Sequence, residues 1–338
     1  MTTNKLTAKH DFFKKNAILD ILYSLCLVAI MIVLLCNPKQ YNKSVLDGIS
    51  LFAMCVLPGL FPFMILTRLL TGIGGVQKLS KLFEKPAGAL FGTSGISSYV
   101  FLMSAISGYP IGAKIIADLY CQGAISQHDA KKMSVFCTTS GPIFVIGTVG
   151  TILFKSAKVG IIIYASHILA SVMSGITLRG KHKKQSDCVP AVASAKVDNL
   201  IASTVSDSVQ NILIVGAYIT IFFLFADILF QTGLIKIVCY PFDMLFSCFG
   251  LQNLSTGFVF GLLEVTRGAK MLSTHANIWS VCLCAALVSF SGLSIIMQSM
   301  NYFSKCKIKT RSFVFSKCVH ALYTFVICFA LCKLFVVS

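Results

Sequence analysis

Residues 107–114 of the chain read Ser-Gly-Tyr-Pro-Ile-Gly-Ala-Lys, and a related stretch, Gly-Leu-Leu-Glu-Val-Thr-Arg-Gly-Ala-Lys, occupies residues 261–270. Both stretches interrupt apolar sequence, and their Gly-Ala-Lys ends lie almost half the chain apart. Glycine, proline and charge are costly inside a membrane unless they line a site enclosed by protein. Helices interrupted at matching positions of two halves are typical of a transporter's binding centre. These stretches therefore predict a duplicated membrane protein with its site at the interruptions.

Composition places the chain in a membrane. Of its 338 residues, 56% are hydrophobic and 12% are charged, which is outside the balance of a soluble domain. The net charge of +17 does not indicate a nucleic-acid partner, because the basic residues form short clusters between apolar runs, as in loops that set membrane topology. We expect a multi-pass protein of the bacterial inner (plasma) membrane, in contact with the lipid bilayer.

Seven apolar runs are long enough to cross a bilayer. They are residues 17–36, 48–70, 133–154, 159–178, 211–231, 277–300 and 313–336. The first resembles a secretory signal but has about 20 residues and no cleavage pattern, so we interpret it as a retained helix.

The two interrupted stretches lie in regions whose arms are too short to cross. Residues 94–120 and 250–275 each form two arms of about a dozen residues, which favours re-entrant helical hairpins. With the N-terminus inside, the basic clusters at 78–85, 131–132, 179–184 and 305–311 all fall in the cytoplasm, and Ser338 falls outside. One hairpin then opens from each side of the membrane.

This map predicts an all-α polytopic membrane protein with about seven transmembrane helices plus two re-entrant hairpins in an inverted repeat. Each unit has one span, a hairpin and two spans, so the second unit is inverted. Ser140-Gly141-Pro142 and Ser291-Gly292 weaken the span after each hairpin at a similar spacing (291 − 140 = 151). The predicted divisions are 1–44, an N-terminal segment with the first helix; 45–178, the first repeat; 179–199, a basic cytoplasmic linker; and 200–338, the second repeat.

Four motifs in this order resemble a known family. They are SGYPIGAK, TSGPIFVIGTVG (139–150), GLLEVTRG and SFSGLSIIMQ (289–298). Over residues 45–335 the chain resembles the YlbJ-type sporulation integral membrane proteins of the nucleoside-recognition, or Gate-domain, group, which is distantly similar to concentrative nucleoside transporters. The resemblance implies a duplicated, hairpin-containing transport core. Glu264 echoes the acidic hairpin motif of those transporters, whereas Tyr109-Pro110 stands where the first hairpin would carry a carboxylate.

Glu264 is the leading candidate for function, because a carboxylate inside a membrane must be paired or protonatable. It either contacts the substrate and couples transport to a proton or sodium ion, or forms a structural ion pair with Lys114, Arg267 or Lys270. The two lysines either bind an anionic group or extend to the membrane surface.

Pro110 is expected to start the second arm of its hairpin, which leaves amide groups free for carboxylate, phosphate or ribose oxygens. Tyr109 either stacks on a ring or packs, and the serines either hydrogen-bond a solute or allow close packing. We expect Asp118 and Asp227 to be interfacial. The predicted substrate-binding residues are Gly108, Tyr109, Pro110, Lys114, Ser140, Pro142, Glu264, Thr266, Ser291 and Gln298.

Enzymatic and metal chemistry are not indicated. The chain has no G-x-S-x-G, P-loop or H-E-x-x-H motif, and its 14 cysteines lie mostly in apolar runs without zinc-site spacing, so no cofactor or metal is predicted. We expect a secondary transporter or permease-like protein for a small polar solute, with a nucleoside-like compound as one candidate, working by alternating access. The alternative is a sporulation protein with an assembly role and no transport. A homo-oligomer is compatible with either.

Overall fold

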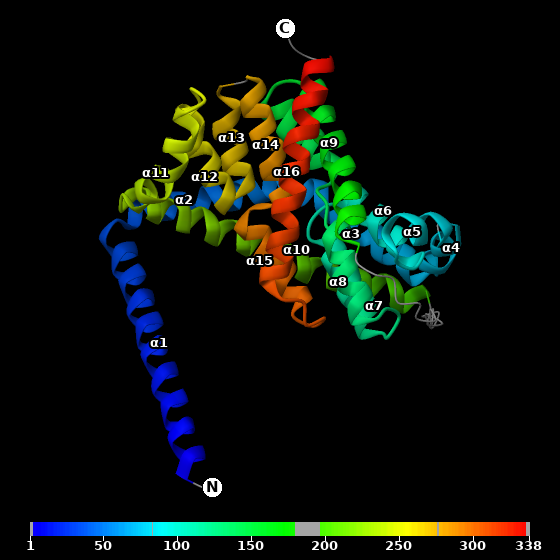
Figure 1. The fold of residues 1–338 in the computed structure, drawn as a ribbon, viewed down its shortest axis with the longest axis horizontal. Helices are drawn as coiled ribbons and strands as arrows, with labels where there is room; N and C mark the ends of the chain where they lie inside the picture. The colour runs from blue at the N-terminus through cyan, green and yellow to red at the C-terminus, as the bar shows by residue number, and fades with distance from the viewer. Residues whose placement is uncertain (1–2, 83, 180–196, 276, 336–338) are drawn as a thin grey trace.

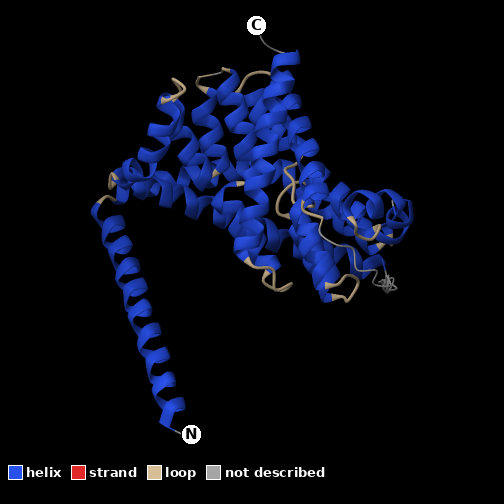
Figure 2. Cartoon of the chain, viewed as in Figure 1, coloured by secondary structure: helices blue, strands red, loops and turns tan. Residues whose placement is uncertain are grey.

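The computed structural model describes residues 3–82, 84–179, 197–275 and 277–335, and every element in this part of the chain is a helix (Figures 1 and 2). In chain order these are α1 (Thr3–Cys36), α2 (Pro38–Leu51), η1 (Phe52–Val56), α3 (Leu57–Gly72), α4 (Gly75–Leu82), α5 (Glu84–Phe91), α6 (Ile96–Ser107), α7 (Ile111–Cys121), α8 (Gln127–Phe136), η2 (Ile143–Leu153), α9 (Ala157–Thr177), α10 (Val197–Gln231), α11 (Leu234–Ser247), η3 (Gln252–Leu254), α12 (Ser255–Leu263), α13 (Val265–Ser273), α14 (Ile278–Phe290), α15 (Gly292–Phe303) and α16 (Thr310–Phe335). The segments η1 and η2 are π-helical, and η3 is a 3₁₀ turn. Most of the predicted linker, from 180 to 196, lies outside the described residues, as does Ser338.

The predicted all-helical, multi-span protein is confirmed. Six described stretches are long and apolar enough to cross a membrane, and a seventh results if the bent pair α5–α6 counts as one span. The six are Leu19–Cys36, Pro38–Gly72, Ala157–Thr177, Leu200–Gln231, Ile278–Phe303 and Thr310–Phe335.

The predicted span at 133–154 is wrong as one continuous helix. α8 ends at Phe136, the chain is non-helical up to Gly141, and η2 follows Pro142. Proline has no amide hydrogen to continue a helix, and glycine favours non-helical backbone, so the Ser-Gly-Pro step breaks the span. The predicted span at 277–300, which follows the second predicted hairpin, also breaks. The break lies between α14 and α15, where Ser291 and Gly292 have φ of 81° and 69°. Both breaks fall at the predicted Ser-Gly steps.

Helix α1 stands apart from the rest of the molecule (Figure 1). It meets α2 at the Asn37–Pro38 junction, and none of its apolar window Leu19–Cys36 is buried. The remaining helices form the bundle that carries the site.

Two pairs of short helices are joined by tight, non-helical connections. Residues 108–110 connect α6 to α7, and Glu264 alone connects α12 to α13. A methyl group on Gly268 would lie 2.2 Å from the Cα atom of Gly261, so the second pair packs backbone against backbone. These pairs cover the residues for which hairpins were predicted.

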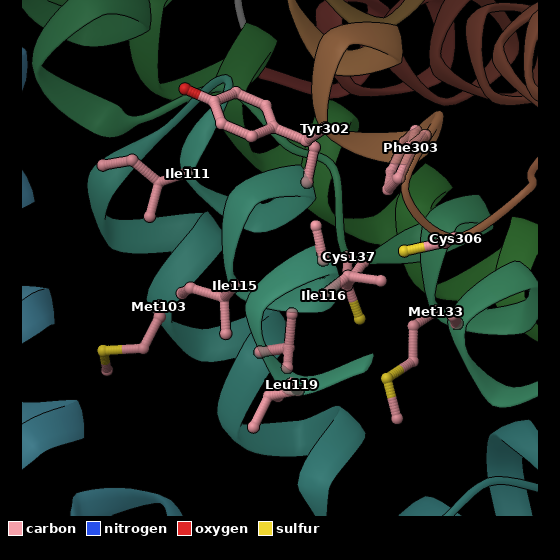
Figure 3. Close-up of a cluster of buried hydrophobic side chains, with 14 of the residues drawn as sticks. Met103, Ile111, Ile115, Ile116, Leu119, Met133, Cys137, Tyr302, Phe303 and Cys306 are labelled. Atoms are coloured by element: carbon pink, nitrogen blue, oxygen red, sulfur yellow. The ribbon is translucent and has the colours of Figure 1, made fainter. Parts of the chain in front are cut away.

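The first pair is anchored by an apolar core. Figure 3 shows side chains of α6 and α7 packed with α8 and with the C-terminal end of α15. The labelled residues are Met103, Ile111, Ile115, Ile116, Leu119, Met133, Cys137, Tyr302, Phe303 and Cys306. Most of these residues are fully or nearly fully buried. Their packing keeps the α6–α7 connection (residues 108–110) next to the break that follows α8.

Three of the basic clusters meet at one end of the molecule. Lys131, Lys307 and Lys309 line one surface depression, and Lys131 and Arg179 line a neighbouring one. The Arg179 guanidinium also donates to the carbonyl of Ala89 at the end of α5. Clusters that the sequence assigned to one side of the membrane therefore lie together.

Candidate functional site

A small cavity lies where the helix interruptions meet. Its volume is about 80 Å³. The four helix interruptions, at residues 108–110, 137–141, 264 and 291–292, form part of its wall or lie directly beside it. Residues of η1, α3 and α10 form the rest of the wall. The lining residues include Cys55, Gly59, Ser107, Gly108, Tyr109, Ser140, Gly141, Val215, Ile219, Glu264, Val265, Thr266, Val288, Ile295 and Gln298. The cavity is therefore mostly apolar, with a few polar groups that converge on it, as is typical of small-molecule sites.

Glu264 is the buried carboxylate of this cavity, with 2% of its surface exposed. It caps α13, and its carboxylate accepts a hydrogen bond from the Arg267 amide at 2.8 Å and further bonds from Thr266. The positive end of the helix thus faces the negative charge. The Arg267 guanidinium instead pairs with Asp227 at 2.5 Å. Within the described residues Glu264 has no ion-pair partner, so the structural salt bridge with Lys114, Arg267 or Lys270 is not formed.

Tyr109, at the first connection, lines the same cavity as Glu264, at the second. The Tyr109 hydroxyl accepts a hydrogen bond from the Lys317 ammonium at 2.8 Å. Its own hydrogen has a distant acceptor, the carbonyl of Val288 at 3.5 Å, and the Ser291 side chain also contacts it. Tyr109 can therefore donate to a solute in the cavity.

Lys317 is a fully buried lysine on α16 that the sequence-based list of site residues missed. Its Nζ donates to the Tyr109 hydroxyl and to the carbonyl of Thr138 at 2.9 Å, and Thr138 Oγ1 at 3.4 Å and Nδ1 of His320 at 3.5 Å are further acceptors. Every hydrogen on Nζ therefore has an acceptor within reach. No carboxylate in the described structure pairs with it. A charge in the middle of an apolar span was the available signal, and the same rule that selected Glu264 applies to it.

Two buried histidines hold the first span break. His167 Nε2 accepts from the Ser140 amide at 2.8 Å, so Nδ1 carries the hydrogen and donates to Ser289 Oγ at 2.7 Å. His320 Nε2 donates to the His167 carbonyl at 2.9 Å, and the two rings stack with centroids 4.8 Å apart. The histidines are 153 residues apart, close to the 151-residue spacing of the two Ser-Gly steps. That coincidence was a usable signal, which the motif search did not include.

The remaining predicted residues divide into three groups. Gly108, Ser140, Thr266 and Gln298 line the cavity. Pro110 and Pro142 precede α7 and η2 directly and so set the direction of the helix that follows. Ser291 is buried at the break between α14 and α15 and is not among the residues that line the cavity. Pro110 stands one residue before the first turn that was expected to contain it.

Lys114, one of the predicted substrate-binding residues, is not among the residues that line the cavity with Tyr109 and Glu264. It pairs with Asp118 at 3.1 Å in a separate cavity that is also lined by Arg68, whose guanidinium pairs with Asp207. α7 directs the fourth residue after Pro110 away from the interruption, since one helical turn carries it 5.4 Å along the axis. Asp118 forms its ion pair with Lys114 and Asp227 with Arg267, and Lys270 is exposed.

Apolar helices of spanning length around a mostly apolar cavity with a few polar groups define a multi-pass integral membrane protein. The chain is 27% identical to the sporulation integral membrane protein YlbJ of Bacillus subtilis (strain 168), over 95% of its own length and 84% of that protein. This likeness supports the resemblance to YlbJ-type proteins and, with the spans, places the chain among multi-pass bacterial membrane proteins. No protein-family model matches the chain, and no solved structure matches it significantly.

Proposed function

We propose that the protein is a secondary transporter that moves a small polar solute by alternating access around the cavity between Tyr109 and Glu264. The observation that carries this proposal is one cavity lined by two interrupted helix pairs and by a broken span, with a buried carboxylate that has no ion-pair partner among the described residues. Interrupted helices are rare where lipid surrounds them and are typical of sites that bind a solute in transporters.

An inverted repeat accounts for this arrangement. In the proposed first unit, α3 is followed by the pair α6–α7, the broken span α8–η2 and α9. In the second unit, α10 is followed by α12–α13, the broken span α14–α15 and α16. His167 on α9 and His320 on α16 then occupy equivalent positions in the two units, and their rings stack on each other. The two helix pairs act as re-entrant hairpins that open to opposite sides.

Glu264 is the proposed coupling group. Its carboxylate is held by amide and hydroxyl donors instead of a cation, so a proton or a sodium ion can neutralise it without competing with a salt bridge. Tyr109, Ser140 and Gln298 provide the neutral hydrogen bonds for the solute. Binding of the ion and the solute together lowers the free-energy cost of the conformational change, because fewer charged and polar groups are then left unpaired in an apolar environment.

Lys317 is the proposed latch of the first hairpin. Its bond to Tyr109 holds the hairpin tip against α16, and its bond to Thr138 holds the first span break. Outward movement of the tip exchanges the Lys317–Tyr109 bond for a bond to the solute.

The cavity size bears on the substrate. A volume of about 80 Å³ is below the roughly 300–1,000 Å³ typical of pockets for larger ligands. A solute of a few heavy atoms fits the cavity as it stands, whereas a nucleoside requires the hairpins to separate.

Accessibility of Cys55 tests transport without knowledge of the substrate. Cys55 lines the cavity from η1 and is a native reporter. The cysteines that are exposed among the described residues (26, 36, 121, 248 and 318) are first replaced by serine, together with Cys188, which lies outside the described residues. A charged, membrane-impermeant thiol reagent is then applied to right-side-out and to inside-out vesicles, and modified peptides are identified by mass spectrometry. Alternating access predicts modification of Cys55 from both sides, while fully buried Cys137 stays unmodified.

The second candidate function is an assembly role in spore formation, which the printed name of the Bacillus subtilis relative suggests. It predicts that Cys55 is modified from one side or neither, which contradicts alternating access. Uptake of uridine into proteoliposomes then separates nucleosides from other solutes. Saturable flux that loses its pH or sodium dependence in Glu264→Gln supports a coupled nucleoside carrier.

A further inference from the structure

Three cysteine side chains meet between α14 and α16, away from the proposed transport cavity. Cys282 lies on α14, and Cys328 and Cys332 lie one turn apart on the same face of α16. Their sulfur atoms all lie within 4.8 Å of one another. Exposed fractions of 0%, 0% and 2% show that the group, which we term the three-thiol cluster, is enclosed.

We propose that the three-thiol cluster binds a trivalent thiophilic ion of the arsenite type through three sulfur atoms. Arsenous acid, As(OH)₃, exchanges its three hydroxyl groups for three cysteine sulfurs. Three As–O bonds break, three As–S bonds form, and each thiol proton leaves with a hydroxyl group as water. The arsenic stays trivalent, so the exchange needs no oxidant or reductant.

Charge selects this class of ion over other thiophilic metals. The cluster belongs to an apolar core, with Trp279, Phe325 and Phe329 packed beside it. A trivalent ion with three thiolates is neutral, whereas Cu⁺ with three thiolates keeps two negative charges, which are expensive to bury. Zn²⁺ prefers four ligands, and the group found in the described residues offers three.

The cluster lies close to one end of its helices. Cys332 is three residues before Phe335, the last residue of α16, and Cys282 is in the second turn of α14. One helical turn rises about 5.4 Å, so an ion entering beside the start of α14 travels a short path. None of the three cysteines is among the described residues that line the transport cavity, which makes the two sites separately testable.

Arsenic stoichiometry tests the site in the full-length protein. The purified chain, with cysteines 26, 36, 121, 248 and 318 replaced by serine, is equilibrated with sodium arsenite and desalted. Arsenic and protein are then quantified by mass spectrometry. We expect one arsenic per chain, three thiols protected from alkylation, and three As–S bonds in the X-ray absorption spectrum.

Serine variants provide the controls. Cys282→Ser and Cys332→Ser each remove one of three linked ligands and should weaken binding about a hundredfold. Cys284→Ser changes an equally buried cysteine on the same helix that is not in the cluster, and should bind like the parent. If Cys282→Ser misfolds, Cys332→Ser at the cluster's edge decides. Equal arsenic retention by the cluster variants and the parent, no retention by the parent, or fewer than three As–S bonds would overturn the proposal.

Discussion

The hydrogen bond between Lys317 and Tyr109 makes a quantitative prediction for stability. In the folded protein, the Tyr109 hydroxyl is one of four acceptor atoms around the fully buried Nζ of Lys317. Tyr109→Phe keeps the ring and removes that acceptor. Removal of one partner of a buried hydrogen bond costs about 1–3 kcal/mol. We therefore expect the free energy of unfolding to fall by about this amount, which is roughly a 5- to 150-fold change in the folding equilibrium.

A second background isolates the pairwise contribution. In Lys317→Met, the Tyr109 hydroxyl has lost its donor and has the Val288 carbonyl at 3.5 Å as its remaining backbone acceptor, so Tyr109→Phe there should cost close to zero. The difference between the two backgrounds is the coupling energy of a double-mutant cycle. Methionine retains much of the apolar stem of lysine, which limits the cavity that the substitution creates.

Unfolding in mixed micelles of increasing SDS content provides the measurement. Trp279 is the single tryptophan of the chain and packs against Phe329 with ring centroids 5.3 Å apart, so its fluorescence reports tertiary structure. A cost below about 0.5 kcal/mol for Tyr109→Phe, or an equal cost in both backgrounds, would refute the assignment of Lys317 as the latch.

Two further predictions concern packing and topology. Gly268→Ala should destabilise the protein by about 1–3 kcal/mol or more, because its methyl group meets the Gly261 backbone. The control Gly147→Ala adds a methyl group where there is open space, so it should be neutral or stabilising. Equal effects of the two variants in the same SDS assay would contradict the close packing of α12 and α13. Lys309→Cys and Thr274→Cys are made in the same cysteine-replaced background. Lys309→Cys should react with an impermeant maleimide from the cytoplasmic side, and Thr274→Cys should react from the other side. Labelling of both residues from one side would exclude the inverted topology.

Sequence patterns located the interruptions because their chemistry is local. Pro142 lacks an amide hydrogen, and Ser291 with Gly292 adopts left-handed backbone, so each break is encoded within a few residues. The cavity position of Glu264 followed from the cost of a carboxylate in apolar sequence. By contrast, the run at 133–154 has the hydrophobicity of a span, and hydrophobicity does not reveal where a helix stops.

The contacts of Lys317, His167 and His320 depend on tertiary structure. Lys317 reaches a tyrosine 208 residues away, and His167 holds an amide 27 residues earlier. The three-thiol cluster is similar, since an apolar run with cysteines also describes ordinary packing until α14 and α16 are side by side. Lys114 is the opposite case, because it is close to Tyr109 in sequence but lines a different cavity.

Helix α1 has a consequence for how this chain changes over evolutionary time. None of its 18-residue apolar window touches a core, so lipid chains rather than neighbouring side chains solvate it. Exchange among leucine, isoleucine, valine, methionine and phenylalanine there alters no packing, whereas loss of a turn leaves it shorter than the roughly 27 Å that 18 residues reach. Related chains should therefore diverge rapidly in the identity of these residues while conserving their number. The length of α1 then depends on the thickness of the host membrane, and its residue identities are not constrained by packing within the protein.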